Sequence, residues 1–128
     1  MKKVLQNKIL LVVDDENGIC LSLAMYLELS GAKIHTANCG RDAIKIVMAH
    51  KIDFVISDVR MPNGDGIELL EKIRQLDPNI PAVLLATGFA DIDETMAKEK
   101  GAIALLLKPI DFDRLMREIT KALNISNA

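Results

Sequence analysis

The chain alternates five times between a short apolar run and an amphipathic run, and this alternation limits its fold more than any other feature. The apolar runs are too short for ordinary helices and are typical of strands that are covered on both faces. Each run is followed by a segment whose apolar residues recur at helical spacing. The sequence therefore predicts five strands, at residues 8–13, 33–37, 54–58, 82–87 and 102–107.

Glycine, proline and capping residues mark the ends of the amphipathic segments. Gly31 is expected to close the first helix, Pro78 requires the third helix to end before it, and Asp111 is a typical N-cap for the last one. The predicted helices cover residues 17–30, 40–48, 67 to the residues before Pro78, about 90–99, and the segment after Asp111. Strict alternation with short loops implies parallel strands joined by right-handed crossovers, hence a three-layer α/β sandwich.

Length and composition favour one domain that binds neither nucleic acid nor membranes. The 128 residues suit a single domain over residues 1–128, with a core of about 7–124. Aromatic residues make up only 3% of the chain, so the core must be aliphatic and base-stacking surfaces are not expected. The net charge of −2, with no Lys/Arg block, argues against a nucleic-acid or membrane surface.

The sequence also predicts a cytoplasmic location. No apolar stretch approaches the ~20 residues that a membrane helix needs, and the basic start lacks the apolar region and cleavage site of a signal peptide. Cys20 and Cys39 form no CxxC pair. We expect two reduced thiols rather than a disulfide or a redox site.

Polar residues follow four of the five predicted strands at the point where each strand ends. Asp14 and Asp15 follow the first strand, Asp58 ends the third, Thr87 ends the fourth, and Lys108 follows the fifth. In a parallel sheet the carboxyl ends of the strands meet at one edge, which is where ligands bind. The sequence therefore brings three carboxylates, a hydroxyl and an ammonium to the same place.

Three neighbouring carboxylates repel one another, and at least one pKa would rise unless a cation intervenes. Oxygen ligands without nearby His or Cys favour a hard ion, so we expect Mg²⁺ or, less favoured, Mn²⁺. Such a site suits phosphoryl transfer, in which a carboxylate can be the nucleophile. Lys108 would neutralise one phosphoryl oxygen and Thr87 would hydrogen-bond another.

The residues at the strand ends belong to four short motifs, Val12-Val13-Asp14-Asp15-Glu16, Asp58-Val59-Arg60-Met61-Pro62 running into Asp65-Gly66, Ala86-Thr87-Gly88, and Lys108-Pro109. Each motif is weak alone, but their order and spacing together are highly specific. In these motifs the sequence resembles the receiver domains of bacterial response regulators, and the match spans nearly the whole chain.

The resemblance implies a flavodoxin-like fold with strand order 2-1-3-4-5 and phosphoryl transfer onto Asp58 from the phosphohistidine of a sensor histidine kinase or phosphotransfer protein. It implies Mg²⁺ held by Asp15, Asp58 and the backbone carbonyl of Arg60, with Asp14 assisting through water. It also implies a cis Lys108–Pro109 peptide bond. By the same comparison the chain is a signalling switch rather than an enzyme, catalysing only its own phosphorylation and dephosphorylation.

Three positions depart from the family or vary within it. Receivers commonly carry an aromatic residue where this chain has Leu105, so Leu105 either packs as ordinary core or couples more weakly to Thr87. Arg60 and Phe89 border the expected phosphoryl group. They either point to solvent or hinder the attacking water and so lengthen the lifetime of the acyl phosphate.

Two enzyme-like alternatives fit poorly. A phosphatase of the haloacid dehalogenase type needs Asp-x-Asp after the first strand, and an FMN carrier needs a Ser/Thr/Gly phosphate loop where Asp14 and Asp15 stand. The alternative left open is a degenerate receiver that docks without phosphorylation. In either case we expect a homodimer or a downstream effector to use the face formed by the fourth helix, fifth strand and fifth helix. The sequence names neither the kinase nor the output.

Overall fold

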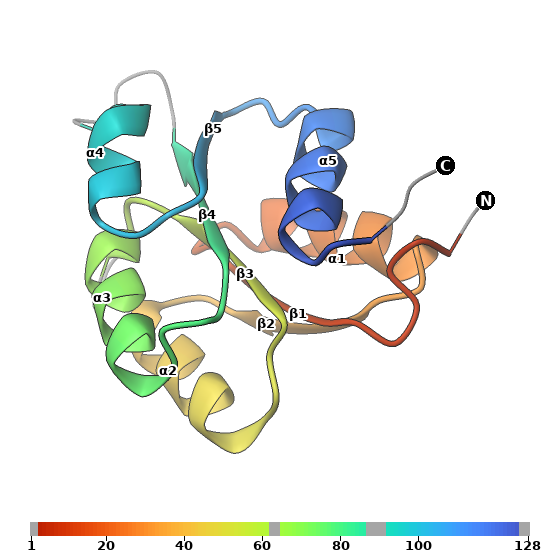
Figure 1. The fold of residues 1–128 in the computed structure, drawn as a ribbon, viewed down its shortest axis with the longest axis horizontal. Coiled ribbons are helices and arrows are strands. Elements are labelled where there is room, and N and C mark those ends of the chain that lie inside the picture. The colour runs from red at the N-terminus through yellow and green to blue at the C-terminus, as the bar shows by residue number, and fades with distance from the viewer. Residues whose placement is uncertain (1–2, 62–64, 87–91, 126–128) are drawn as a thin grey trace.

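The computed structural model describes residues 3–61, 65–86 and 92–125, which form five strands alternating with five helices (Figure 1). The strands are β1 Ile9–Val13, β2 Lys33–Ala37, β3 Phe54–Asp58, β4 Ala82–Ala86 and β5 Ala104–Leu107. The helices are α1 Asn17–Leu29, α2 Gly40–Ala49, α3 Gly66–Leu76, α4 Glu94–Glu99 and α5 Phe112–Ala122. The predicted α/β class is confirmed.

The sheet has the order β2-β1-β3-β4-β5, and each neighbouring pair is parallel. The chain builds outward from β1 in one direction to β2 and then in the other direction through β3 to β5. The strand order therefore reverses between β1 and β3, where α/β sheets place their ligands. Because Val13 pairs with Ser57, the next residues, Asp14 and Asp58, lie side by side where these strands end.

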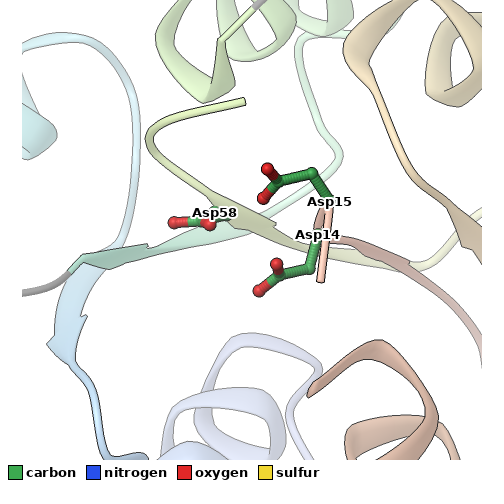
Figure 2. Close-up of side chains that lie close together, drawn as sticks. All are labelled: Asp14, Asp15 and Asp58. Atoms are coloured by element: carbon green, nitrogen blue, oxygen red, sulfur yellow. The ribbon is translucent and has the colours of Figure 1, made fainter. Parts of the chain in front are cut away.

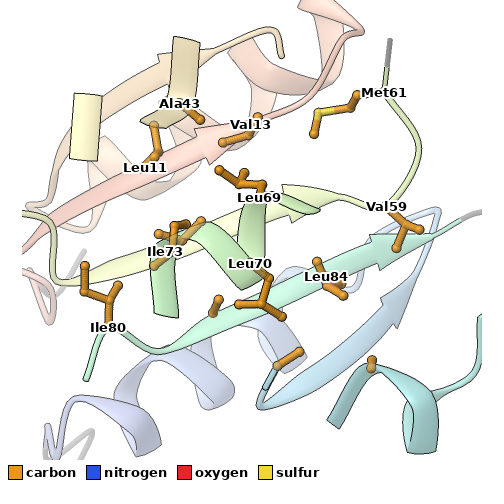
Figure 3. Packing of buried hydrophobic residues seen from close by; sticks show 14 of the residues in the cluster. Leu11, Val13, Ala43, Val59, Met61, Leu69, Leu70, Ile73, Ile80 and Leu84 are labelled. Atoms are coloured by element: carbon orange, nitrogen blue, oxygen red, sulfur yellow. The ribbon is translucent and has the colours of Figure 1, made fainter. Parts of the chain in front are cut away.

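Strand alternation divides the core between the two faces of the sheet. In β1, Leu11 and Val13 face a cluster formed with α2, α3 and α4, whereas Leu10 and Val12 face a cluster formed with α1 and α5. Figure 3 shows the first cluster, in which Leu69, Leu70 and Ile73 of α3 pack against the strands. The core is almost wholly aliphatic, as the composition predicts.

The Leu105-Leu106-Leu107 run in β5 is mostly core. Leu105 is 6% exposed and belongs to the α2–α3–α4 side, while Leu106 is 3% exposed and faces α1 and α5. Leu107 is 59% exposed. Two of the three leucines are thus explained by packing, and one remains at the surface.

The predicted caps at Gly31 and Asp111 are confirmed. Gly31 has φ +96° and donates its N–H to Glu28, while Ala32 donates to the carbonyl of Leu27, which is the Schellman arrangement. Asp111 accepts hydrogen bonds at its side chain from the N–H groups of Asp113 and Arg114.

Two predicted boundaries were wrong by two or more residues. Helix α4 begins at Glu94, because the Asp93 side chain caps it there by accepting from Met96, rather than near residue 90. Strand β5 begins at Ala104 rather than at Ala102, because Ala102 donates back to Ala97 and closes α4. Within the described parts of the chain, no helix is both long and apolar enough to cross a bilayer.

Gly66 and Gly18 offer a matched test of backbone packing. A Cβ added at Gly66 would overlap the backbone carbonyl of Asp58, whereas one added at Gly18 would meet nothing within 4 Å. We expect Gly66→Ala to lower the free energy of unfolding by about 1–3 kcal/mol through overpacking. Gly18→Ala should raise it by about 0.5–1 kcal/mol, since alanine loses less entropy in a helix. Urea denaturation measures both, and equal effects would contradict this packing.

Candidate functional site

Three carboxylates gather where β1 and β3 end, as the sequence predicts. Asp14 and Asp15 follow β1, and Asp58 is the last residue of β3. One oxygen from each lies within 4.8 Å of the others, and Figure 2 shows the three side chains directed into one space. The strand register produces this cluster, because Val13 and Ser57 are paired neighbours in the sheet.

Lys108 comes from the loop after β5 and places its ammonium between two of these carboxylates. Its Nζ donates to Asp14 Oδ2 at 3.0 Å and to Asp58 Oδ2 at 3.1 Å. The Lys108 side chain is only 12% exposed, so the contact is shielded from water. The peptide bond between Lys108 and Pro109 is cis.

The three aspartates differ in burial, and this sets their chemistry. Asp14 is fully buried, Asp58 is 7% exposed, and Asp15 is exposed. Burial raises the pKa of Asp58; the hydrogen bond from Lys108 opposes this rise, and the charges of Asp14 and Asp15 add to it. The surroundings of Asp58 therefore destabilise its ionised form, and a bound cation would reduce this destabilisation.

The pKa of Lys108 is also raised, although burial acts on it in the opposite direction. Burial alone would lower its pKa, but hydrogen bonds to Asp14 and Asp58, together with their charges, outweigh burial and raise the pKa. Lys108 is therefore firmly protonated at neutral pH. One ammonium against three carboxylates leaves the cluster with an excess of negative charge.

The oxygen-rich donor set and its excess negative charge fit a hard divalent cation. Asp14 already uses both carboxylate oxygens, since Oδ1 accepts from the N–H of Glu16 at 2.9 Å and Oδ2 accepts from Lys108. Asp15 and Asp58 are therefore better suited than Asp14 to contact an ion directly. The assistance of Asp14 through water stays a prediction.

A cleft of about 190 Å³ opens onto the cluster. Its walls include Asp15, Asp58 and Lys108, with Arg60 exposed at the wall and Ala86 at the end of β4. Arg60 thus borders the site as expected, while the use of its backbone carbonyl as a metal ligand stays a prediction. The predicted roles of Thr87 and Phe89 fall outside the described residues.

Two contributors were missed by reasoning from sequence. Asn38 donates from Nδ2 to the backbone carbonyl of Asp14 at 3.2 Å, and it follows β2 directly, so the rule that found the other polar residues could have found it. Gly66 belongs to a recognised motif, but its need to lie against the backbone of Asp58 is visible only in three dimensions. Its N–H also donates to the carbonyl of Val59.

Comparison with known proteins adds to this geometry. The family model of the response regulator receiver domain matches residues 10–120. The transcriptional regulatory protein ZraR of Escherichia coli K12 is 40% identical over 115 residues, covering 89% of this chain and 26% of that protein. GlrR of the same organism is 34% identical over 117 residues, or 91% of this chain. The chain spans about a quarter of the length of these curated relatives.

Solved structures agree with the sequence matches. The receiver domain of the Francisella response regulator 1452 superposes with a TM-score of 0.84 at 25% identity, covering 92% of this chain and 98% of that one. The beryllofluoride-activated NtrC4 receiver domain, solved as a dimer, gives 0.82 at 33% identity, covering 91% and 96%. The chain therefore belongs to the response regulator receiver domain family of two-component signal transduction.

Proposed function

We propose that Asp58 accepts a phosphoryl group from the phosphohistidine of a sensor histidine kinase or phosphotransfer protein in a Mg²⁺-dependent reaction. The observation that carries this proposal is the position of the Lys108 ammonium, which bridges Asp14 and Asp58 beside a third carboxylate. This arrangement supplies a nucleophile, a fixed positive charge and a set of metal ligands at one cleft.

The proposed step exchanges one phosphorus bond for another. A carboxylate oxygen of Asp58 forms a bond to phosphorus as the nitrogen–phosphorus bond of the donor breaks, and the imidazole nitrogen leaves with the electron pair. Asp15, Asp58 and the backbone carbonyl of Arg60 would hold Mg²⁺, with Asp14 acting through water. Bound Mg²⁺ would neutralise charge on the phosphoryl oxygens. Water would later hydrolyse the acyl phosphate and restore the Asp58 carboxylate. The chain would therefore catalyse only its own phosphorylation and dephosphorylation.

Phosphorylation would change the surface through Lys108 and Thr87. The new group adds about two negative charges, which compete with Asp14 for the Lys108 ammonium. Thr87 would turn toward the phosphoryl oxygens, and the buried Leu105 would transmit that movement less completely than an aromatic side chain.

Arg60, exposed beside the cleft, and Phe89 would slow the attack of water. Phosphorylation would shift the equilibrium between an inactive and an active conformation, both of which are already populated before the reaction.

The exposed surface of α1 supports docking of a phosphoryl donor. Leu21, Met25 and Leu29 of α1 are 62%, 57% and 62% exposed, and their four-residue spacing puts them on one helix face. A largely apolar cleft of about 520 Å³ lies between α1 and the segment from Lys108 to Phe112. Because Lys108 lines both this cleft and the acidic one, a partner bound here could reach Asp58.

We further propose that a second face serves the output. Met96 of α4 and Leu107 of β5 are 45% and 59% exposed, which leaves apolar surface for a second copy of the chain or an effector. The NtrC4 receiver, which this chain resembles, was solved as an activated dimer. The family membership supports a cytoplasmic location, where kinases of this class present their phosphohistidine.

Incubation with acetyl phosphate and Mg²⁺ tests the phosphorylation proposal. We expect wild type and Asp42→Asn, an exposed aspartate on α2, to gain one phosphoryl group by intact-mass spectrometry. Asp58→Asn should gain none, and chelation of Mg²⁺ should prevent the reaction in every variant. An unmodified wild type would overturn the proposal and favour the degenerate docking module.

The raised pKa of Asp58 gives a stability prediction with a definite sign. Because burial raises this pKa, the ionised carboxylate destabilises the native state as the pH rises through the raised value. Without Mg²⁺, Asp58→Asn should therefore be more stable than wild type at pH 7, and the difference should narrow as the pH falls toward the ordinary aspartate pKa. Urea unfolding at several pH values measures this; a less stable Asp58→Asn at pH 7 would contradict it.

Positive charges on the exposed face of α1 formed by Leu21, Met25 and Leu29, here called the α1 stripe, should distinguish docking of the kinase from the phosphoryl-transfer step. Leu21→Lys with Met25→Lys should slow transfer from an autophosphorylated histidine kinase at least tenfold, since docking would then bury two ammonium groups against an apolar surface. Phosphorylation by acetyl phosphate should be unchanged. Leu76→Lys is the control, because Leu76 is 49% exposed but ends α3 at the opposite edge of the sheet. Equal transfer to wild type and the α1 variant would rule out docking on this stripe.

A further inference from the structure

The loop after β2 reaches across to the loop that carries two of the acidic residues. Asn38 uses both hydrogens of its side-chain amide there. It donates to the backbone carbonyl of Asp14 at 3.2 Å and to the side-chain Oδ1 of Asn17 at 2.8 Å. Asn17 is the first residue of α1, so one side chain holds both ends of the short segment that contains Asp15.

Asp15 is the member of the acidic cluster whose position depends most on this segment. Asp14 is fully buried and fixed from several directions, by the carbonyl of Ala37 at its N–H, by Lys108 at Oδ2 and by the N–H of Glu16 at Oδ1. Asp15 is exposed, and its carboxylate lies within 4.8 Å of two like charges. Repulsion therefore favours movement of Asp15 away from the cluster before a cation binds.

The hydrogen bonds of Asn38 oppose this movement by restraining the backbone on either side of Asp15. They do so with a neutral amide, which adds no charge to a site already crowded with carboxylates. Side chains that orient metal ligands in this way commonly tune metal affinity without touching the ion. The free-energy cost of ordering the ligands is therefore incurred when the protein folds, and it does not have to be supplied when the cation binds.

We propose that Asn38 is a positioning residue for the cation site, holding the 14–17 segment so that Asp15 faces Asp58. This inference rests on the proposed function, because it takes Mg²⁺ as the ion. It assigns Asn38 a role in metal affinity, and no role in the phosphoryl-transfer step itself.

Titration calorimetry with MgCl₂ on the full chain tests this assignment. Asn38→Ala should raise the Mg²⁺ dissociation constant about tenfold, the lower end of the effect that loss of a ligand-orienting hydrogen bond has. Asn17→Ala, which removes one of the two hydrogen bonds, should give a smaller rise. Asn79→Ala, an exposed asparagine after α3, is the control and should bind as wild type does.

A second readout separates positioning from a merely structural role. With acetyl phosphate, Asn38→Ala should need more Mg²⁺ for half-maximal phosphorylation, yet it should reach the wild-type rate at saturating Mg²⁺. The urea midpoint without metal should stay close to that of wild type, since Asn38 is exposed. If wild type binds Mg²⁺ and Asn38→Ala binds it within twofold, the inference is overturned while the proposed function stands. If wild type binds no Mg²⁺, both fail.

Discussion

The contact between the Lys108 ammonium and the carboxylates of Asp14 and Asp58 is the interaction on which the rest of the site depends. It joins residues 94 and 50 positions apart in the chain, so it exists only when β1, β3 and β5 are assembled in one sheet. Two buried carboxylates without this ammonium would be strongly destabilising. The same contact still leaves the cluster negatively charged, because Asp15 adds a third carboxylate. Folding therefore gathers an oxygen-rich cluster with an excess of negative charge, which fits a divalent cation.

The position of this contact links chemistry to recognition. Lys108 lies between the acidic cleft and the apolar cleft beside α1, so one side chain borders both the proposed reaction and the proposed docking surface. The opposite face of β5 buries Leu105 under α4 and leaves Leu107 at the surface. Phosphorylation of Asp58, as proposed, would act on these surfaces through β5 and the loop that carries Lys108.

Much of the fold was predictable because the central strands are covered on both faces and therefore appear as nearly unbroken apolar runs, as in Leu10 to Val13 and Ala82 to Ala86. Glycines and caps gave most helix ends, as at Gly31 and Asp111. The boundaries of α4 and β5 were misjudged because Ala102 is apolar and suits a strand, yet its N–H closes the preceding helix. Apolar character alone does not reveal where a backbone N–H donates.

The sequence by itself determined which groups meet, because polar residues after parallel strands share one edge of the sheet and Asp14, Asp15, Asp58 and Lys108 are such residues. Only the tertiary structure decided how each group is used. It buries Asp14 with both carboxylate oxygens engaged, leaves Asp15 exposed, and brings Asn38 and Gly66 against the backbone of the acidic residues. Hydrogen bonds and close contacts between distant residues follow from strand register and loop path, which no periodicity in the sequence encodes.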